Sequence, residues 1–278
     1  MPIRVAVPKE IYPGERRVAL IPDVSRKMAK LDIEVLLESG AGDAAHYPDA
    51  AFDSARIVSD AGSLYGEADI ILTVQPPELE VIEQLREGSI LVGMLLPCQR
   101  LQHVARLKER KITSFAMELV PRISRAQSMD TLSSQAAAAG YKAVIMAAER
   151  SGHFFPMLTT AAGTIRPSRV VVIGAGVAGL QAIATARRLG AIVEGYDVRT
   201  AAKEQVESLG AIGIPAQGDV VTSASAAGVL VEPGWRVLVA GGPGVSEAVQ
   251  AAGAEAVPND GTLPDTPVEA VVTGLHRD

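Results

Sequence analysis

Short runs of apolar residues alternate with stretches of helical spacing along the first 116 residues. Charged and turn-forming residues separate the two kinds of stretch, and the apolar runs have the length of strands. This alternation is typical of a parallel β-sheet covered by helices, although it does not give the order of the strands. The predicted strands are residues 3–7, 33–37, 70–74, 89–95 and 112–116, and the predicted helices are residues 23–30, capped by Asp23, 78–85 and 99–110.

Residues 118–135, ELVPRISRAQSMDTLSSQ, interrupt this pattern with a polar segment. The alanine-rich run that follows predicts a long helix to about residue 150, which Ser128 or Asp130 could cap. From the pattern alone, a capped helix start with a surface loop and a binding site explain the polarity equally well. The side chains with the chemistry of a binding site include Arg122, Gln127, Asp130 and Ser133.

Residues 169–199 combine a strand, a glycine-rich turn, a helix and a second strand. The β-branched run at 170–173 predicts a buried strand, helical spacing continues to Arg188, and a strand is expected at 191–196. Glycines at these spacings allow a tight turn, the approach of a pyrophosphate and close packing of helix on strand. The N-terminus of the helix would face the phosphates. The predicted binding residues of the turn GAGVAG are Gly174, Gly176, Val177, Ala178 and Gly179.

Asp197 follows this turn by about twenty residues, as the dinucleotide fingerprint requires. Its carboxylate should accept from a ribose 2′-hydroxyl and repel a 2′-phosphate, which favours NAD(H) as the cofactor. Arg199 keeps NADP(H) open, because an arginine nearby can also bind a 2′-phosphate. The other interpretation of the motif is a glycine-rich turn that binds no nucleotide.

Beyond Arg199 the pattern predicts a helix to residue 209 capped by Thr200, and then a strand at 211–214. Strands at 235–240 and 254–257 and a helix at 245–252 are expected further on. Proline, aspartate and glycine are frequent in residues 258–278, which predicts poor order there.

The length of 278 residues allows two domains, which we place at residues 1–138 and 139–278. No apolar run reaches the roughly 20 residues of a membrane span, and a single cysteine, Cys98, excludes an internal disulfide. The net charge of −6 argues against a nucleic-acid surface. Because no histidine or cysteine has a partner at ligand spacing, we predict no metal site. The arginine pair Arg16 and Arg17 is interpreted either as an anion contact or, preferably, as part of a solvated loop.

Four stretches of the sequence together resemble one family. They are VPKEIYPGERRVALIP, RAQSMDTLSSQAAAAGYKAV, TTAAGTIRPSRVVVIGAGVAGLQAIATARRLGA and DVRTAAKEQVESLGA. They resemble the NAD(H)-binding alpha (alpha-1) subunit of proton-translocating NAD(P) transhydrogenase, which shares a superfamily with alanine dehydrogenase. The resemblance covers about residues 1–211, and it implies two parallel-sheet α/β domains, of which the second is a Rossmann domain.

The resemblance implies a subunit that binds NADH and presents it to an NADP-binding beta-type component for direct hydride transfer. It implies that Arg122, Gln127, Asp130 and Ser133 contact the nicotinamide and its ribose. It also implies membrane-spanning partner subunits, a homodimer, and a position at the cytoplasmic face of the inner membrane. Catalysis would then consist mainly of orienting two nicotinamide rings.

Two residue positions separate the chain from alanine dehydrogenase. That enzyme is expected to carry a lysine in the segment that here reads Thr73-Val74-Gln75-Pro76, and a histidine in the segment from Met94 to Cys98. This chain has Gln75 and no histidine there. Without a cation for the carboxylate and a base for the amine, alanine oxidation lacks its chemical means.

The resemblance ends where the composition changes. Residues 211–278 contain two arginines, no lysine and eight acidic residues, and so carry the whole net charge of −6. The family's longer nucleotide domain is not recognisable in this divergent tail. Two hypotheses follow: a working transhydrogenase subunit, or a catalytically silent or truncated NAD-binding paralogue.

Overall fold

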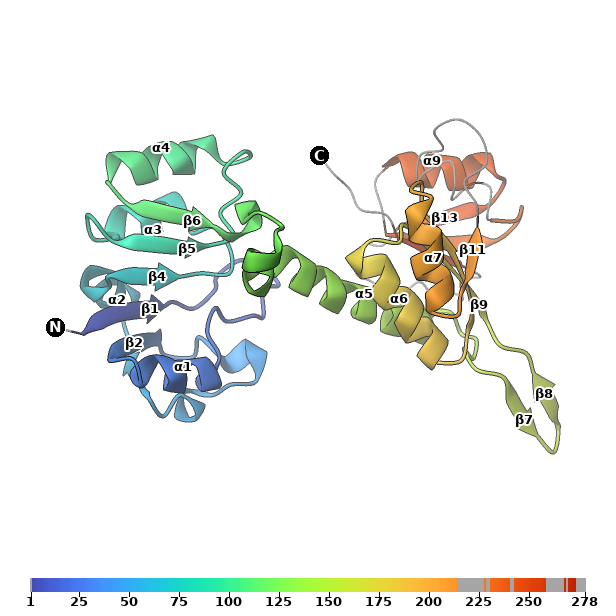
Figure 1. Ribbon diagram of the computed structural model, residues 1–278, viewed down its shortest axis with the longest axis horizontal. Helices are drawn as coiled ribbons and strands as arrows, with labels where there is room; N and C mark the ends of the chain where they lie inside the picture. Colours follow the sequence, from blue (N-terminus) through green and yellow to red (C-terminus); the bar gives the residue numbers. More distant parts are fainter. Residues whose placement is uncertain are drawn as a thin grey trace. The chain divides into compact units, whose positions relative to one another are not determined.

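The computed structural model describes residues 2–214, 228, 231–240, 243–258, 268 and 270–273. The chain divides into two compact units, Met1–Thr131 and Leu132–Asp278 (Figure 1). This division and the predicted boundary at residues 138 and 139 both fall within helix α5 (Thr131–Arg150).

Unit 1 is built on a six-stranded parallel sheet with the order β3-β2-β1-β4-β5-β6. The order reverses between β1 and β4, and the carboxyl edge of an open sheet at such a point is where ligands tend to bind. The strands are β1 (Ile3–Val7), β2 (Ile33–Glu38), β3 (Ala55–Val58), β4 (Ile70–Leu72), β5 (Ile90–Gly93) and β6 (Thr113–Ala116). The α-helices are α1 (Pro22–Ala29), α2 (Ala61–Glu67), α3 (Leu79–Gln84) and α4 (Leu101–Glu109).

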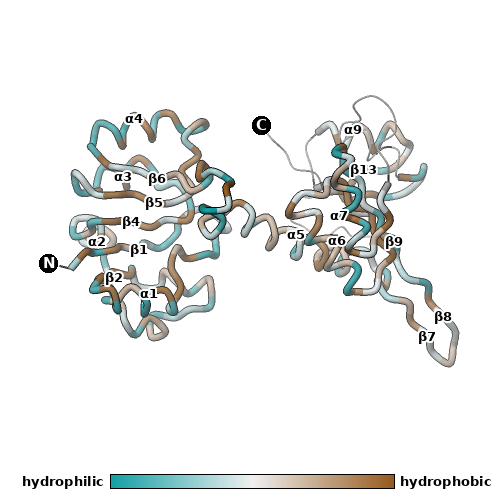
Figure 2. Tube along the Cα trace, in the orientation of Figure 1, coloured by the Kyte–Doolittle hydropathy of each residue, from teal (hydrophilic) through white to brown (hydrophobic). Residues whose placement is uncertain are grey.

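The apolar runs of the sequence become the centre of this sheet, brown in Figure 2. On one face Leu36, Ile71 and Leu91 are at most 1% exposed and pack with apolar residues of α2, α3 and α4. On the other face Leu37 and Phe52 belong to a second buried cluster, beside α1. Strands buried on both faces read as continuous apolar runs, which is why their positions were predictable.

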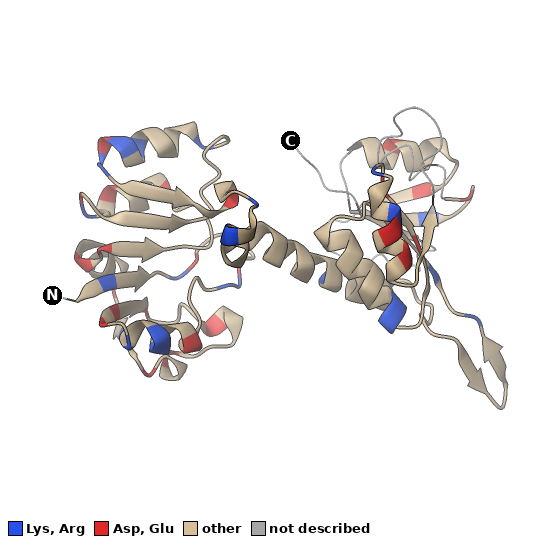
Figure 3. Ribbon diagram, in the orientation of Figure 1, with Lys and Arg blue, Asp and Glu red and all other residues tan. Residues whose placement is uncertain are grey.

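Acidic and basic residues are mixed over the outside of unit 1 (Figure 3). Many pair across elements, such as Arg56 with Glu34 and Lys111 with Glu87. Exposed pairs of this kind contribute about 1 kcal/mol or less each. The buried sheet therefore dominates the stability of the unit.

Unit 2 contains two three-stranded parallel groups, β11-β10-β9 and β13-β12-β14, and β14 lies beside β9. An antiparallel hairpin, β7 (Leu158–Thr160) and β8 (Gly163–Ile165), extends from this unit (Figure 1). The parallel strands are β9 (Arg169–Ile173), β10 (Ile192–Tyr196), β11 (Ile212–Ile214), β12 (Arg236–Ala240), β13 (Glu255–Pro258) and β14 (Ala270–Thr273). Besides α5, the helices with described bounds are α6 (Val177–Arg188), α7 (Ala201–Ser208) and α9 (Pro243–Ala251).

The predicted α/β class, with a parallel sheet in each half and a Rossmann-like second half, is confirmed. Two predicted caps are wrong: Thr200 is itself helical and makes no capping hydrogen bond, and α1 begins after Ile21, with Asp23 inside its first turn. Poor order at residues 258–278 is wrong for β14, and most of the remaining positions lie outside the described residues. Within the described residues no helix is long and apolar enough to cross a bilayer.

Candidate functional site

The glycine-rich turn after β9 has the backbone that its spacing predicts. Gly174 has a φ of +96°, a left-handed conformation that favours glycine. A Cβ at Gly179 would lie 1.7 Å from the carbonyl oxygen of Gly174, so helix and turn pack too closely for any side chain. By contrast, a Cβ at Gly176 would meet nothing within 4 Å. The fold itself therefore requires Gly174 and Gly179, whereas Gly176 leaves open space at the start of α6.

The N-terminus of α6 provides the donors for an anion. Gly176 is the N-cap, and Val177 and Ala178 form the first helical positions. The first amides of a helix have no partner within it, and they lie at the positive end of the helix dipole. Gly176 and Val177 are exposed, so a phosphate has access to this end.

Asp197 is attached to the turn by a backbone hydrogen bond. The amide of Ala175 donates to Asp197 Oδ2 at 2.8 Å, which joins the carboxyl ends of β9 and β10. Ala175 is 1% exposed and was not among the predicted site residues. In the sequence, only the position of Ala175 between two glycines indicates that its amide could bind Asp197.

Arg199 makes the other contacts of Asp197. Its amide and its Nε donate to Oδ1 at 2.8 and 2.9 Å, and its Nη2 donates to Oδ2 at 2.9 Å. The hydrogen bond from Arg199 is the main reason that the pKa of Asp197 falls to about 2, against the opposing effect of burial. Asp197 is therefore a carboxylate at neutral pH, as the ribose-binding prediction requires.

The polar segment of residues 118–135, called here the RAQSMD segment, is attached to the sheet of unit 1 at its start, through Glu118. This residue lies in the short helix η3 (Met117–Leu119), and its carboxylate accepts hydrogen bonds from the amides of Leu95 and Leu96. A second short helix, η4 (Ser124–Met129), follows and buries Ala126. The segment is thus an ordered part of the carboxyl edge rather than a plain loop.

The four predicted nicotinamide contacts lie along this segment and the start of α5. Arg122 and Gln127 are exposed, and Asp130, immediately before α5, is half-buried. Ser133 is half-buried in the first turn of α5 and belongs to unit 2. The structure thus places the first three in unit 1, and the glycine turn and Asp197 in unit 2. The roles of all these residues remain predictions.

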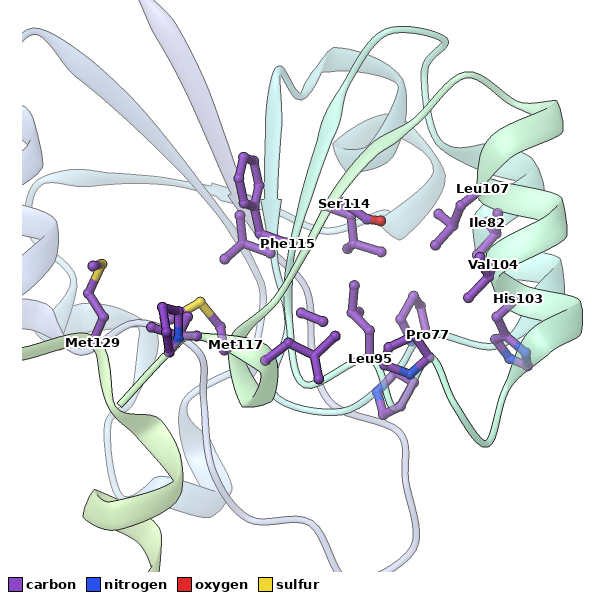
Figure 4. A pocket seen from close by; sticks show the side chains of 18 of the residues that line it. Pro77, Ile82, Leu95, His103, Val104, Leu107, Ser114, Phe115, Met117 and Met129 are labelled. Atoms are coloured by element: carbon purple, nitrogen blue, oxygen red, sulfur yellow. The ribbon is translucent and has the colours of Figure 1, made fainter. Parts of the chain in front are cut away.

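A cavity of about 800 Å³ lies beside the same segment within unit 1 (Figure 4). Leu107 of α4, Phe115 of β6 and Met129 are among its mainly apolar lining residues. Ser114 and His103 add polar side chains. A pyrophosphate needs several convergent donors, which this lining lacks, so the cavity is a weaker candidate for the dinucleotide than the glycine turn.

A cluster of polar residues lies where the strand order reverses in unit 1. Glu10 accepts hydrogen bonds from the amides of Val74 and Gln75, at the carboxyl end of β4. Glu15 accepts from the side chain of Gln75 at 2.7 Å and from both Nε and Nη2 of Arg17. Arg17 thus belongs to an ordered network, which departs from the preferred interpretation as a solvated loop.

The two carboxylates of this cluster have opposite pKa shifts. Hydrogen bonding to Arg17 lowers the pKa of Glu15 to about 2, although burial opposes it. Burial raises the pKa of Glu10, against the effect of its two backbone donors. The guanidinium of Arg17 is therefore paired with the carboxylate of Glu15.

Comparisons with known proteins identify the family. The family models for the N-terminal and C-terminal domains of alanine dehydrogenase/PNT match residues 6–139 and 143–227. An NAD(P) transhydrogenase alpha subunit of Rhodospirillum rubrum is 48% identical over 233 residues, which cover 81% of this chain and 61% of that protein. The alanine dehydrogenase of Halomonas elongata is 31% identical over 200 residues, covering 70% of this chain and 53% of the enzyme.

A solved structure agrees with these sequence relatives. The transhydrogenase of Sinorhizobium meliloti superposes with a TM-score of 0.77 and 43% identity, covering 87% of this chain and 70% of that structure. This chain spans about three fifths of the length of the Rhodospirillum rubrum relative, and residues 228–278 lie outside both family models. The chain therefore belongs to the alanine dehydrogenase/PNT family, among the relatives of NAD(P) transhydrogenase alpha subunits.

Proposed function

We propose that this chain is the NAD(H)-binding component of a proton-translocating NAD(P) transhydrogenase and presents NADH for hydride transfer to NADP⁺ on a partner subunit. The observation that carries the proposal is the hydrogen bond between Ala175 N and Asp197. It holds a carboxylate for ribose beside a glycine turn for pyrophosphate, in a chain that belongs to a family of nicotinamide-dinucleotide enzymes.

The residues present fit such a cofactor. The open space at Gly176 admits a pyrophosphate, and the first amides of α6 donate to it. Asp197 accepts from the adenosine ribose hydroxyls, and its negative charge selects against a 2′-phosphate. The bound dinucleotide supplies the hydride, so the protein needs to bind and orient rather than to transfer protons.

Arg122, Gln127, Asp130 and Ser133 orient the nicotinamide end in this proposal. The glutamine amide and the serine hydroxyl can bind a carboxamide or ribose hydroxyls, and the charged pair can fix the ring position. Each small displacement of a reacting ring reduces the rate, because the rate depends mainly on proximity and orientation.

The subunit would act with partners. We propose that an NADP-binding beta-type component and membrane-spanning components complete the enzyme, and that two copies of this chain form a homodimer. The chain would then lie in the cytoplasm, at the face of the inner membrane, bound through those partners. The names of the relatives, which are subunits of an enzyme, support this proposal.

Calorimetric titration of the purified chain with NADH and with NADPH tests the first step. NADH binding with weaker or absent NADPH binding is expected. Hydride exchange from NADH to an NADP⁺ analogue, after addition of the NADP-binding component of a relative, tests the second step. A protein that is folded by circular dichroism yet binds neither nucleotide would contradict the proposal.

A catalytically silent NAD-binding paralogue is the second candidate. It is favoured by residues 228–278, which neither family model matches and which follow the intact turn and Asp197. The same exchange assay separates the two candidates. NADH binding without any exchange, under conditions where a relative's subunit is active, would support the silent protein.

A further inference from the structure

We propose that Asp197 and Arg199 together select NADH over NADPH. Asp197 pairs with Arg199 and so keeps this arginine from binding the 2′-phosphate of NADPH. The inference rests on the proposed function, since it concerns the dinucleotide bound at the glycine turn. It gives Arg199 a role in cofactor selection, which the sequence alone does not decide, since an arginine near Asp197 is compatible with NAD(H) and with NADP(H).

Both oxygens of Asp197 accept hydrogen bonds from the protein. Two donors reach Oδ1, and two reach Oδ2 when the amide of Ala175 is counted. Three of these four donors belong to Arg199, which is therefore the main partner of the carboxylate. The carboxylate is only 7% exposed, whereas the Arg199 side chain is 62% exposed.

The guanidinium of Arg199 faces this carboxylate with two nitrogens, an arrangement that also matches a phosphate. Its Nη2 lies 3.3 Å from the carbonyl oxygen of Ala175 as well, which keeps the side chain against the turn. A 2′-phosphate beside Asp197 would be repelled by its negative charge. The Arg199 guanidinium that could bind this phosphate is already paired with Asp197.

Removal of Asp197 should therefore have a defined consequence. Without the carboxylate, Arg199 keeps its place beside the turn but loses its anionic partner. It then becomes a ligand for the 2′-phosphate of NADPH. Selectivity would reverse through Arg199, and not only through the loss of repulsion by Asp197.

Four proteins test this: the wild type, Asp197→Ala, Asp197→Ala with Arg199→Gln, and Asp197→Ala with Arg169→Gln. Arg169 is a matched control, because it is an exposed arginine that pairs with Glu194 on the neighbouring strand. Binding of NADH and of NADPH is measured by calorimetry at one fixed salt concentration. Asp197→Asn keeps the side-chain shape and replaces Asp197→Ala if that variant does not fold.

Asp197→Ala is expected to bind NADPH about tenfold more tightly than the wild type, the size of one charge-assisted hydrogen bond. Its NADH affinity should fall. The gain for NADPH should disappear with Arg199→Gln and remain with Arg169→Gln.

Three results would overturn the inference. The first is no gain for NADPH in either Asp197 variant, and the second is a gain that persists without Arg199. Both leave the proposed function intact, provided that the wild type binds NADH. The third is a folded wild type that binds neither nucleotide, which removes the proposed function together with this inference.

Discussion

Gly140, in the middle of helix α5, packs directly against the backbone of Ala178 in the first turn of α6. A Cβ at residue 140 would lie 2.1 Å from the carbonyl oxygen of Ala178, far inside van der Waals contact. Gly140 is buried, and the atoms that it meets are backbone atoms that cannot rotate away. The middle of α5 thus packs against the first turn of α6, next to the glycine-rich turn.

Gly140→Ala should therefore destabilise unit 2 and disturb the turn. Overpacking of this kind costs about 1–3 kcal/mol, against a gain of at most about 1 kcal/mol from the better helix propensity of alanine. Urea unfolding followed by circular dichroism measures the free energy of unfolding. Titration with NADH measures the affinity, which should fall if the glycine-rich turn is disturbed.

Gly66 provides the matched control for that substitution. It lies in helix α2, is exposed, and would give a Cβ nothing within 4 Å. Gly66→Ala should leave NADH binding unchanged and stabilise the protein slightly, since only helix propensity changes. If both variants change the free energy of unfolding and NADH affinity equally, the close contact between Gly140 and Ala178 does not contribute to stability or binding.

Gly176→Ala should separate binding from folding. Because its Cβ would meet no protein atom within 4 Å and its φ of −78° suits any residue, the free energy of unfolding should hardly change. NADH affinity should nevertheless fall about tenfold or more, because the methyl group would occupy the approach of the pyrophosphate. Calorimetry and thermal unfolding on the same preparation measure both quantities.

Gly174→Val is the contrasting change at the same turn. Its left-handed φ of +96° is strained for a β-branched residue, so both stability and NADH binding should be lost. Unaltered NADH affinity in both glycine variants would remove the pyrophosphate-binding interpretation of the turn.

The sequence predicted best where a residue's own conformation or burial decides the structure. The buried apolar runs gave the central strands, and the glycine spacing gave the turn, because only glycine fits at Gly174 and Gly179. Strand β3 and helix α2 were missed, since β3 carries exposed residues such as Arg56 and α2 contains two glycines. The Asp60 side chain that caps α2 was the available signal.

Relations between distant segments could not be predicted from the pattern. The amide of Ala175 and the carboxylate of Asp197 meet only because β9 and β10 are neighbours, and strand order is absent from the alternation. The failed cap at Thr200 has a local explanation: Thr200 is in the helical conformation, and the amides of Ala202 and Lys203 already donate to the backbone carbonyls of Arg199 and Thr200. The site residues named from the resemblance stay predictions.

Glu15 should make the stability of unit 1 depend on acid. Its pKa is lowered from 4.5 to about 2 by Arg17, so its contribution is present above pH 4.5 and is lost as the pH falls towards 2. Because Arg17 is partly exposed, the contribution should be about 1 kcal/mol. Urea unfolding at a series of pH values should show a shallower loss of stability between pH 4.5 and 2 for Glu15→Gln than for the wild type.

Glu10 supplies a control of opposite sign. Burial raises its pKa, so its contribution is present at low pH and is lost as the pH rises through the raised pKa. Glu10→Gln should therefore make the acid loss steeper than in the wild type. Equal pH dependence in all three proteins would show that the network with Gln75 does not influence stability.

Asp130→Asn is expected to depress hydride transfer and to leave NADH affinity largely intact. The residue is half-buried immediately before α5, and the amide keeps its shape but loses the charge that would fix the nicotinamide ring. Stopped-flow transfer to an NADP⁺ analogue on the partner component measures the rate, and calorimetry measures NADH affinity. A decrease of about tenfold or more in rate is expected, equivalent to about 1.4 kcal/mol of barrier.

Asp60→Asn is the control that tests whether replacing any aspartate at the start of a helix lowers the rate of hydride transfer. Asp60 caps α2 by accepting from the amide of Ser63 at 2.7 Å. Asparagine can also cap a helix but loses the negative charge at the helix N-terminus, so this substitution should lower stability slightly and leave transfer unchanged. If Asp130→Asn instead lowers NADH affinity strongly, Asp130 is a binding residue. If it lowers only the free energy of unfolding, as Asp60→Asn does, Asp130 is a helix cap, and the orientation of the nicotinamide must depend on the other three predicted residues.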